Sequence, residues 1–137
     1  MRIVKDDYII TDESSDVNIE FVKQLLSKTY WAEKRPLDVI KKSIEHSVCF
    51  SLYKNDLQIG FARVVTDYST FGYLADVIID KEYRGKGLGK WFIETIISDD
   101  RWCNLLLILA TKDAHKLYEK YGFKNSEILM GKIHIIG

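Results

Sequence analysis

The sequence lacks a long apolar segment and a net charge, and both absences exclude classes of protein. Its longest apolar run, LLLILA at 105–110, is far shorter than the roughly 18 residues of a membrane-spanning helix, and the amino-terminal residues lack a secretory signal. Twenty basic and twenty acidic side chains cancel, so the chain lacks the overall basic field that nucleic-acid binding usually shows, and a local basic patch is the alternative. We therefore predict a soluble protein without nucleic-acid or membrane partners.

Cysteine and histidine are also scarce and scattered. Cys49 and Cys103 lie in apolar segments without C-x-x-C spacing, which favours reduced thiols in a cytoplasmic protein over a disulfide. His46 and His134 have no ligand-like neighbours, so we expect no metal site. Repeats, linkers and low-complexity segments are missing too, and a chain of 137 residues that is 47% apolar predicts a single domain over residues 1–137.

The hydrophobic periodicity predicts the element order β-α-α-β-β-β-α-β-α-β. We expect strands at residues 1–13, 47–54, 59–67, 73–80, 103–111 and 128–136. We expect helices at residues 18–26, 36–46, 88–97 and 112–122. Hairpin strands followed by a β-α-β unit predict an α+β fold of three layers, in which helices cover both faces of a mixed sheet.

The segment YRGKGLGKW at 83–91 joins an apolar strand to a helix and combines three glycines with basic side chains. Unpaired amides at a helix N-terminus attract anions, and glycine permits positive φ and close approach of a ligand. A phosphate site is therefore predicted over Arg84, Gly85, Lys86, Gly87, Leu88, Gly89 and Lys90. The alternative is a glycine-rich turn with solvated charges. Neither the Walker pattern nor G-x-G-x-x-G fits, which weakens the hypothesis of a nucleotide-binding domain.

The pattern that does fit is [R/Q]-x-x-G-x-G, filled by Arg84, Gly87 and Gly89. It resembles the coenzyme A pyrophosphate loop of the GNAT superfamily of acyl-CoA N-acyltransferases. A second GNAT signature, A-x-x-x-Y before a G-F pair, is matched by Ala114, Tyr118, Gly122 and Phe123. The resemblance covers most of the chain, is strongest over residues 73–123, and implies a mixed, mostly antiparallel, splayed central sheet.

This resemblance implies acetyl-CoA as cosubstrate. The loop amides of residues 85–90 would hold its pyrophosphate, and the pantetheine arm would pair with the backbone of Val77, Ile78 and Ile79 as an added strand does. One of these N–H groups would face the oxyanion of the reaction. Thr111 stands where many relatives carry an asparagine that bonds the pantetheine, and its hydroxyl offers one donor instead of two.

The resemblance also implies direct attack of a primary amine on the thioester in a ternary complex. Tyr118 would protonate the leaving thiolate, because it occupies the position of the family's acid. The alternative for Tyr118 is an aromatic residue that packs under the sheet with its hydroxyl bonded locally. Asp76, in an apolar strand, is the candidate base that accepts the amine's proton. The alternative for Asp76 is a structural carboxylate bonded to a lysine or a backbone N–H group.

The acceptor is expected near KTYWAEKRP at 28–36, where Tyr30 and Trp31 would form a wall of the substrate site or, alternatively, cover the sheet. We expect a small amine or a peptide amine as acceptor. A homodimer through the edge of the terminal strand is a further expectation. The alternative function is a non-catalytic acyl-CoA sensor or interaction module.

Overall fold

The computed structural model describes residues 1–132 and contains a six-stranded sheet with helices on both faces. The strands are β1 (Arg2–Lys5), β2 (Tyr8–Thr11), β3 (Val48–Lys54), β4 (Leu57–Thr66), β5 (Phe71–Ile79) and β6 (Leu106–Ile108). They lie side by side in sequence order, and all pairs are antiparallel except β5 with β6. The predicted fold class, a mixed and mostly antiparallel sheet, is confirmed.

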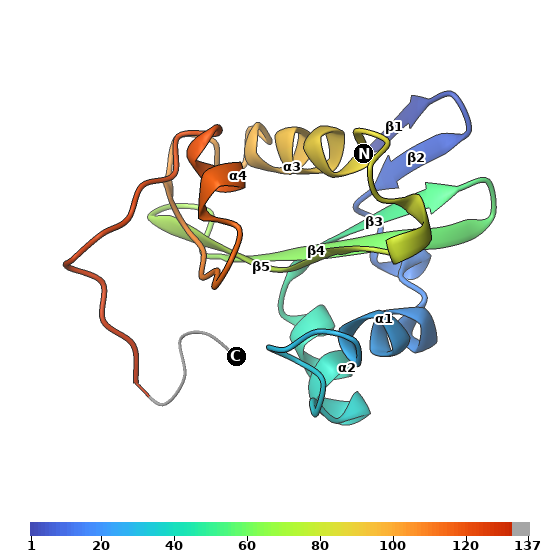
Figure 1. Ribbon diagram of the computed structural model, residues 1–137, viewed down its shortest axis with the longest axis horizontal. Helices are drawn as coiled ribbons and strands as arrows, with labels where there is room; N and C mark the ends of the chain where they lie inside the picture. The colour runs from blue at the N-terminus through green and yellow to red at the C-terminus, as the bar shows by residue number, and fades with distance from the viewer. Residues whose placement is uncertain (133–137) are drawn as a thin grey trace.

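The helices form the outer two of the three layers. They are α1 (Ile19–Leu26), α2 (Leu37–Glu45), α3 (Leu88–Ile97) and α4 (His115–Glu119), with short 3-10 turns η1 (Ser14–Asp16) and η2 (Lys81–Tyr83). Helices α1 and α2 lie against one face of the sheet, and α3 and α4 lie on the other (Figure 1). None of the helices within residues 1–132 has the length and apolar character needed to cross a membrane.

Each face of the sheet has its own apolar core. On the α3 side, Phe92 and Ile96 pack with the buried Trp102. On the other side, Val22 of α1 and Ile40 of α2 pack against the sheet. Helical spacing of apolar residues places one stripe of each helix on the sheet, so burial of that stripe stabilises both the helix and the layer arrangement.

The first and the last of the predicted strands differ from the structure. The single opening strand is a hairpin, β1–β2, because the two residues between Lys5 and Tyr8 form a tight turn in which Asp6 has a φ of 53°. At the carboxyl end, residues 128–132 form no strand, and residues 133–136 lie outside the described residues. The predicted dimer contact involves this terminal segment and stays a prediction.

Strand β5 has two irregularities, a β-bulge opposite β4 and an edge that is only partly paired with β6. The register pairs Phe61 with Ile78 and Arg63 with Ala75, so two residues of β5 oppose one residue of β4 in a β-bulge. Asp76, within this bulge, has a φ of 54°, a left-handed conformation that aspartate tolerates better than most residues. Strand β6 pairs with β5 only along residues 71–73, so within the described chain the edge of β5 beyond Tyr73 has no partner strand. β6 is therefore much shorter than the predicted strand at 103–111.

Candidate active site

A cavity of about 550 Å³ lies where β5 and β6 separate. Its walls come from the α1–α2 connection, the free edge of β5, one side of α3, and the segment from Leu109 into α4. Predicted site residues that line it are Tyr30, Trp31, Asp76, Val77, Ile78, Ile79, Gly89, Thr111 and Tyr118. The fold therefore brings together residues from four distant parts of the sequence. Residues 84–88 and Lys90 lie outside this lining, on the loop and first turn that begin α3.

The glycine loop presents a run of free amides. Gly85 and Gly87 have φ values of 82° and 78°, and Gly87 is the N-cap of α3. A Cβ atom at either position would meet no atom within 4 Å, so backbone conformation, and not crowding, requires glycine there. No N–H group between Gly85 and Lys90 donates to a backbone carbonyl among the described residues. These amides at a helix N-terminus are suited to bind a diphosphate.

The side chains of this loop have different surroundings. Arg84 Nε donates to the carbonyl oxygen of Ile79 at 2.9 Å, which ties the loop to the end of β5. Lys86 lies with its Nζ 5.2 Å from the centre of the Tyr83 ring. Lys90 is exposed on the first turn of α3, and Leu88 is buried in the core beneath it. The lysines add positive charge near the free amides, while Arg84 and Leu88 hold the loop in place.

Tyr118 projects from α4 and is packed on its apolar side. Its ring meets Phe123 edge to face, with centroids 5.8 Å apart, because Gly122, at a φ of 89°, turns the chain back after α4. Burial, with a smaller contribution from Tyr30, raises the pKa of Tyr118 to about 12. The phenol therefore stays protonated over the physiological pH range and is able to donate a proton or a hydrogen bond.

Asp76 is a buried carboxylate held by three donors. Its Oδ1 accepts from Trp31 Nε1 at 3.0 Å, and its Oδ2 accepts from Arg35 Nη1 and Arg63 Nε, both at 2.7 Å. Arg63 Nη1 also donates to Ser47 Oγ at 3.2 Å. Burial alone would raise the pKa of Asp76, but the charges and hydrogen bonds of Arg63 and Arg35 outweigh it and hold the pKa below its ordinary value.

These contacts argue against a proton-accepting role for Asp76. Both of its oxygens are engaged, and a carboxylate with a lowered pKa is a weak base. The partners also differ from the lysine or backbone N–H group that the sequence suggested. Asp76 instead fixes Trp31, Arg35 and Arg63 around one end of the cavity, which makes it a positioning residue.

Arg35 and Arg63 line the cavity. Arg35 belongs to the segment expected near the acceptor, where its charge is a candidate for sorting acceptors, whereas Arg63 was not predicted from the sequence. One signal for Arg63 was present: it is a charged residue inside an apolar strand, as Asp76 is in the next strand. Buried charges require partners, so two opposite charges in adjacent strands suggest a pair. For Arg35, which lies in an irregular connection beside Pro36, the sequence gives its place near the acceptor but not its bond to Asp76.

Tyr30 and Trp31 connect the two sides of the cavity. Their rings meet edge to face with centroids 5.1 Å apart, and the Tyr30 hydroxyl accepts from the backbone N–H of Lys112 at 3.0 Å. Trp31 also packs against the core beneath α1 and α2. Trp31 therefore does both things expected as alternatives: it lines the cavity and it covers the sheet.

Thr111 begins the turn into α4. Its Oγ1 accepts from the backbone N–H of Ala114 at 3.0 Å, which leaves the hydroxyl proton as the group able to bind a ligand. This contact stabilises the segment that carries Tyr118. Within residues 1–132, no group of three or more histidine, cysteine, aspartate or glutamate side chains is arranged to hold a metal ion.

Replacing Asp76 with asparagine should lower the free energy of unfolding by on the order of 3 kcal/mol at pH 7, because two partly buried guanidinium groups lose their counter-charge. Since the folded pKa lies below the ordinary value near 3.8, this contribution is complete at neutral pH, begins to decline near pH 4 and is lost as pH falls through the folded pKa. Urea unfolding at pH 7 and at several pH values below 4 measures both effects.

The matched control is Asp6→Asn. Asp6 has nearly the same left-handed φ, 53°, but its side chain is exposed. We expect a change within about 0.5 kcal/mol for this surface position. Equal stability of the Asp76→Asn variant and the unchanged protein at pH 7 would contradict the structural role of the carboxylate.

The family follows from comparison of the whole chain with known proteins. A family model described as an acetyltransferase (GNAT) domain matches residues 45–125, which is more than half of the chain. The protein therefore belongs to the GNAT family of acetyltransferases. A crystal structure of a GNAT-family protein from Xanthomonas campestris pv. campestris superposes with a TM-score of 0.88 at 34% identity, covering 93% of this chain and 94% of that one.

Curated relatives carry acetyltransferase names as well. An uncharacterized N-acetyltransferase, ycf52, of Porphyra purpurea is 30% identical over 88% of this chain and 71% of its own length. A glucosamine 6-phosphate N-acetyltransferase of Trypanosoma brucei brucei is 36% identical over a shorter stretch, 41% of this chain and 40% of its own length. Both relatives are named as N-acetyltransferases, and only the second name states an acceptor.

Proposed function

We propose that this protein is an N-acetyltransferase that moves the acetyl group of acetyl-CoA to a primary amine by direct attack. One observation carries the proposal. The free edge of β5 and the Tyr118 side chain line the same cavity, and the free amides of the glycine loop begin α3, which also contributes to its wall. Groups able to bind phosphate therefore lie at the start of α3, next to the cavity that holds the groups for backbone pairing and proton donation.

Binding of acetyl-CoA would use backbone groups of this chain. The amides of residues 85–90 would bind the pyrophosphate, with Lys86 and Lys90 adding positive charge. The backbone of Val77, Ile78 and Ile79, on the unpaired edge of β5, would hydrogen-bond the amides of the pantetheine arm. The Thr111 hydroxyl would donate to the same arm. When bound, acetyl-CoA supplies an activated acyl group whose carbonyl carbon accepts the amine.

The reaction forms a C–N bond and breaks the C–S bond. A backbone N–H group of the β5 bulge would stabilise the oxyanion, and donors of this kind typically contribute about 3 kcal/mol to barrier lowering. Tyr118 would donate its hydroxyl proton to the leaving sulfur. With a pKa of about 12, Tyr118 is a weaker acid than an ordinary phenol, but burial in the same cavity would raise the thiol's pKa as well.

The acceptor amine must lose a proton before it attacks. Because Asp76 is held by three donors, we assign this step to water that enters from the cavity mouth. Trp31 and Tyr30 would contact the body of the acceptor and keep its nitrogen aimed along β5.

An assay of thiol release with acetyl-CoA and a panel of amines tests this function, with mass spectrometry of the acetylated products. We expect turnover with at least one class of primary amine and none without an acceptor. Binding of CoA without turnover on any amine, peptides included, would favour an acyl-CoA sensor. Tighter binding of ATP or NAD than of CoA, measured by calorimetry, would overturn the assignment of the glycine loop.

A further inference from the structure

Two arginines meet a single carboxylate at one end of the cavity. Arg35, from the α1–α2 connection, and Arg63, from β4, both bond Oδ2 of Asp76. Their side chains are 21% and 13% exposed, and that of Asp76 is 3% exposed. Among the described residues, no second carboxylate lies within 4.0 Å of either guanidinium. The cluster therefore has a surplus of one positive charge.

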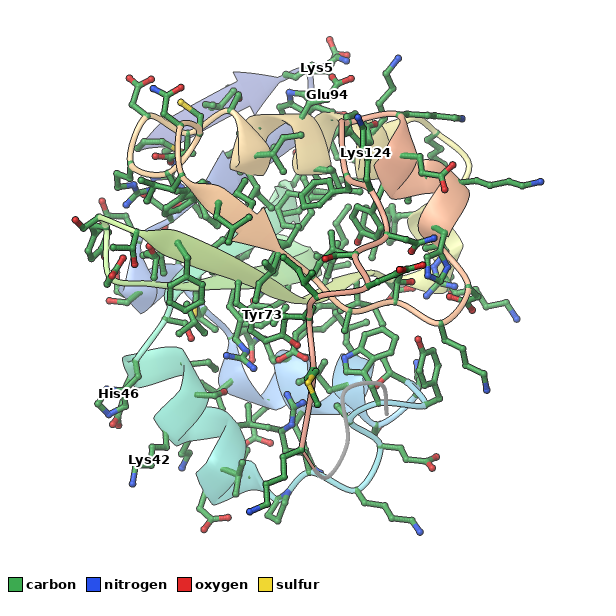
Figure 2. The ribbon with its side chains drawn as sticks, turned by 90° about the vertical axis from the view of Figure 1, so that its left-hand side faces the viewer. Lys5, Lys42, His46, Tyr73, Glu94 and Lys124 are labelled. Carbon is green, nitrogen blue, oxygen red and sulfur yellow. The ribbon has the colours of Figure 1, made fainter. Side chains whose placement is uncertain are left out.

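Both guanidinium groups keep donors for a ligand. Arg35 uses Nη1 and Arg63 uses Nε and Nη1 in hydrogen bonds within the described chain, which leaves Nη2 of each free of a partner there. Both residues line the cavity together with Trp31 and Tyr73. Tyr73 is labelled in Figure 2, where β5 runs between the two helical layers.

The opposite wall does not neutralise this surplus. The remaining charged residue of the lining is Asp113, which follows Thr111 on the segment leading into α4 and is exposed to solvent. Asp113 forms no salt bridge with Arg35 or Arg63, whose partner is Asp76. A partly buried and uncompensated guanidinium is costly unless an anion binds to it.

We infer that the acceptor is an anionic amine, whose carboxylate or phosphate is bound by Arg35 and Arg63; this rests on the acetyl transfer proposed above. Guanidinium groups bind both kinds of oxyanion through paired, charge-assisted hydrogen bonds. A carboxylate adds one negative charge and brings the cluster to neutrality, and a phosphate monoester adds about −1.5 to −2. Trp31, fixed by Asp76, would pack against the acceptor between its anionic group and its amine. Polyamines and other polycations would be repelled from the same cluster.

Matched pairs of acceptors test the inference. The first pair is phenylalanine and phenylalaninamide, and the second is phosphoethanolamine and ethanolamine. We expect kcat/KM for the member that carries a carboxylate or phosphate, in at least one pair, to exceed that of the member that lacks it by about tenfold or more, the effect of one charge-assisted bond. The amine of phenylalaninamide loses its proton more readily than that of phenylalanine. This difference alone would favour phenylalaninamide, so a preference for phenylalanine would have to come from binding of the carboxylate. The two pairs separate carboxylate from phosphate recognition.

Arg35→Gln should reduce this preference to about threefold or less, because Asp76 keeps Arg63 and Trp31 while the acceptor loses one cation. Arg35→Lys, which keeps the charge and loses the planar fork, should retain an intermediate preference. The control is Lys42→Gln, on the exposed side of α2 and away from Tyr73 (Figure 2), which should leave both the rates and the preference unchanged. Circular dichroism checks that each variant is folded.

The outcomes separate this inference from the proposed function. Equal rates for both members of each pair, or a preference for spermidine, would overturn the anionic acceptor and leave acetyl transfer standing. If no amine turns over, binding of the four compounds to the protein is measured by titration, with tryptophan fluorescence as the signal. Binding of the anionic members alone, lost in Arg35→Gln, would support the anion site and reject the transfer. Absence of any such difference would overturn the inference.

Discussion

Replacing Gly87 with aspartate should weaken binding of coenzyme A at least about 100-fold, equivalent to about 2.8 kcal/mol. Gly87 is the N-cap of α3 at a φ of 78°, in the middle of the run of free amides. A carboxylate there would repel the pyrophosphate and would itself occupy the N–H groups that the ligand needs. Isothermal titration with CoA measures the loss directly.

The control for this variant is Gly87→Asn. Asparagine has the size of aspartate and also tolerates a left-handed backbone, so it reproduces the steric and conformational change without the charge. We expect its affinity for CoA to lie much closer to that of the unchanged protein. Similar losses in both variants would mean that backbone strain, and not anion repulsion, controls the loop. Normal affinity for CoA in Gly87→Asp would contradict binding of the pyrophosphate at this site.

Replacing Tyr118 with phenylalanine should lower kcat by about 100-fold, the usual scale for loss of a general acid, and leave the dissociation constant of CoA nearly unchanged. The substitution keeps the edge-to-face contact with Phe123, so the fold of the α4 segment should be preserved. The control is Tyr121→Phe, three residues along the same segment and outside the cavity lining, which should retain full turnover. An unchanged rate in Tyr118→Phe would assign proton donation to water.

The pH dependence of turnover gives an independent check on Tyr118. Because burial raises its pKa to about 12, its hydroxyl remains protonated well above pH 10. We therefore expect kcat to show no decline with a midpoint near 10, the value of an ordinary phenol. A rising limb at lower pH should follow the acceptor amine and shift when the acceptor is changed. A limb that stays fixed for all acceptors would point to a titrating group of the protein.

Much of the fold could be predicted because it depends on local patterns. Helices α1, α2 and α3 follow from apolar residues at helical spacing and from the Asn18 cap, whose Oδ1 accepts from the N–H of Phe21 at 3.1 Å. The β3–β4 hairpin follows from the polar connection expected at residues 55–58, of which the structure uses only the first two as the turn, with Asn55 at a φ of 52°. In contrast, the same kind of turn at Asp6 could not be predicted, because the strands on either side are too short to show an alternation of apolar and polar residues.

The length of β6 could not be predicted from its own residues. An apolar run from 103 to 111 suits a long buried strand, yet pairing ends where β5 and β6 separate. That separation belongs with the bulge at Asp76, a feature of the register between β4 and β5. Strand composition says which residues are able to pair, whereas the register and twist of neighbouring strands decide how far they do so.

The sequence by itself determined the glycine loop that begins α3, since positive φ at glycine and free amides at a helix N-terminus are properties of a short contiguous segment. It also marked Tyr118, through a spacing contained within one short helix and its turn. Only the tertiary structure decided the role of Asp76, because its partners Arg35 and Arg63 lie 41 and 13 residues away. Whether a carboxylate acts as a base or as a positioning residue depends on the charged groups that the fold places beside it.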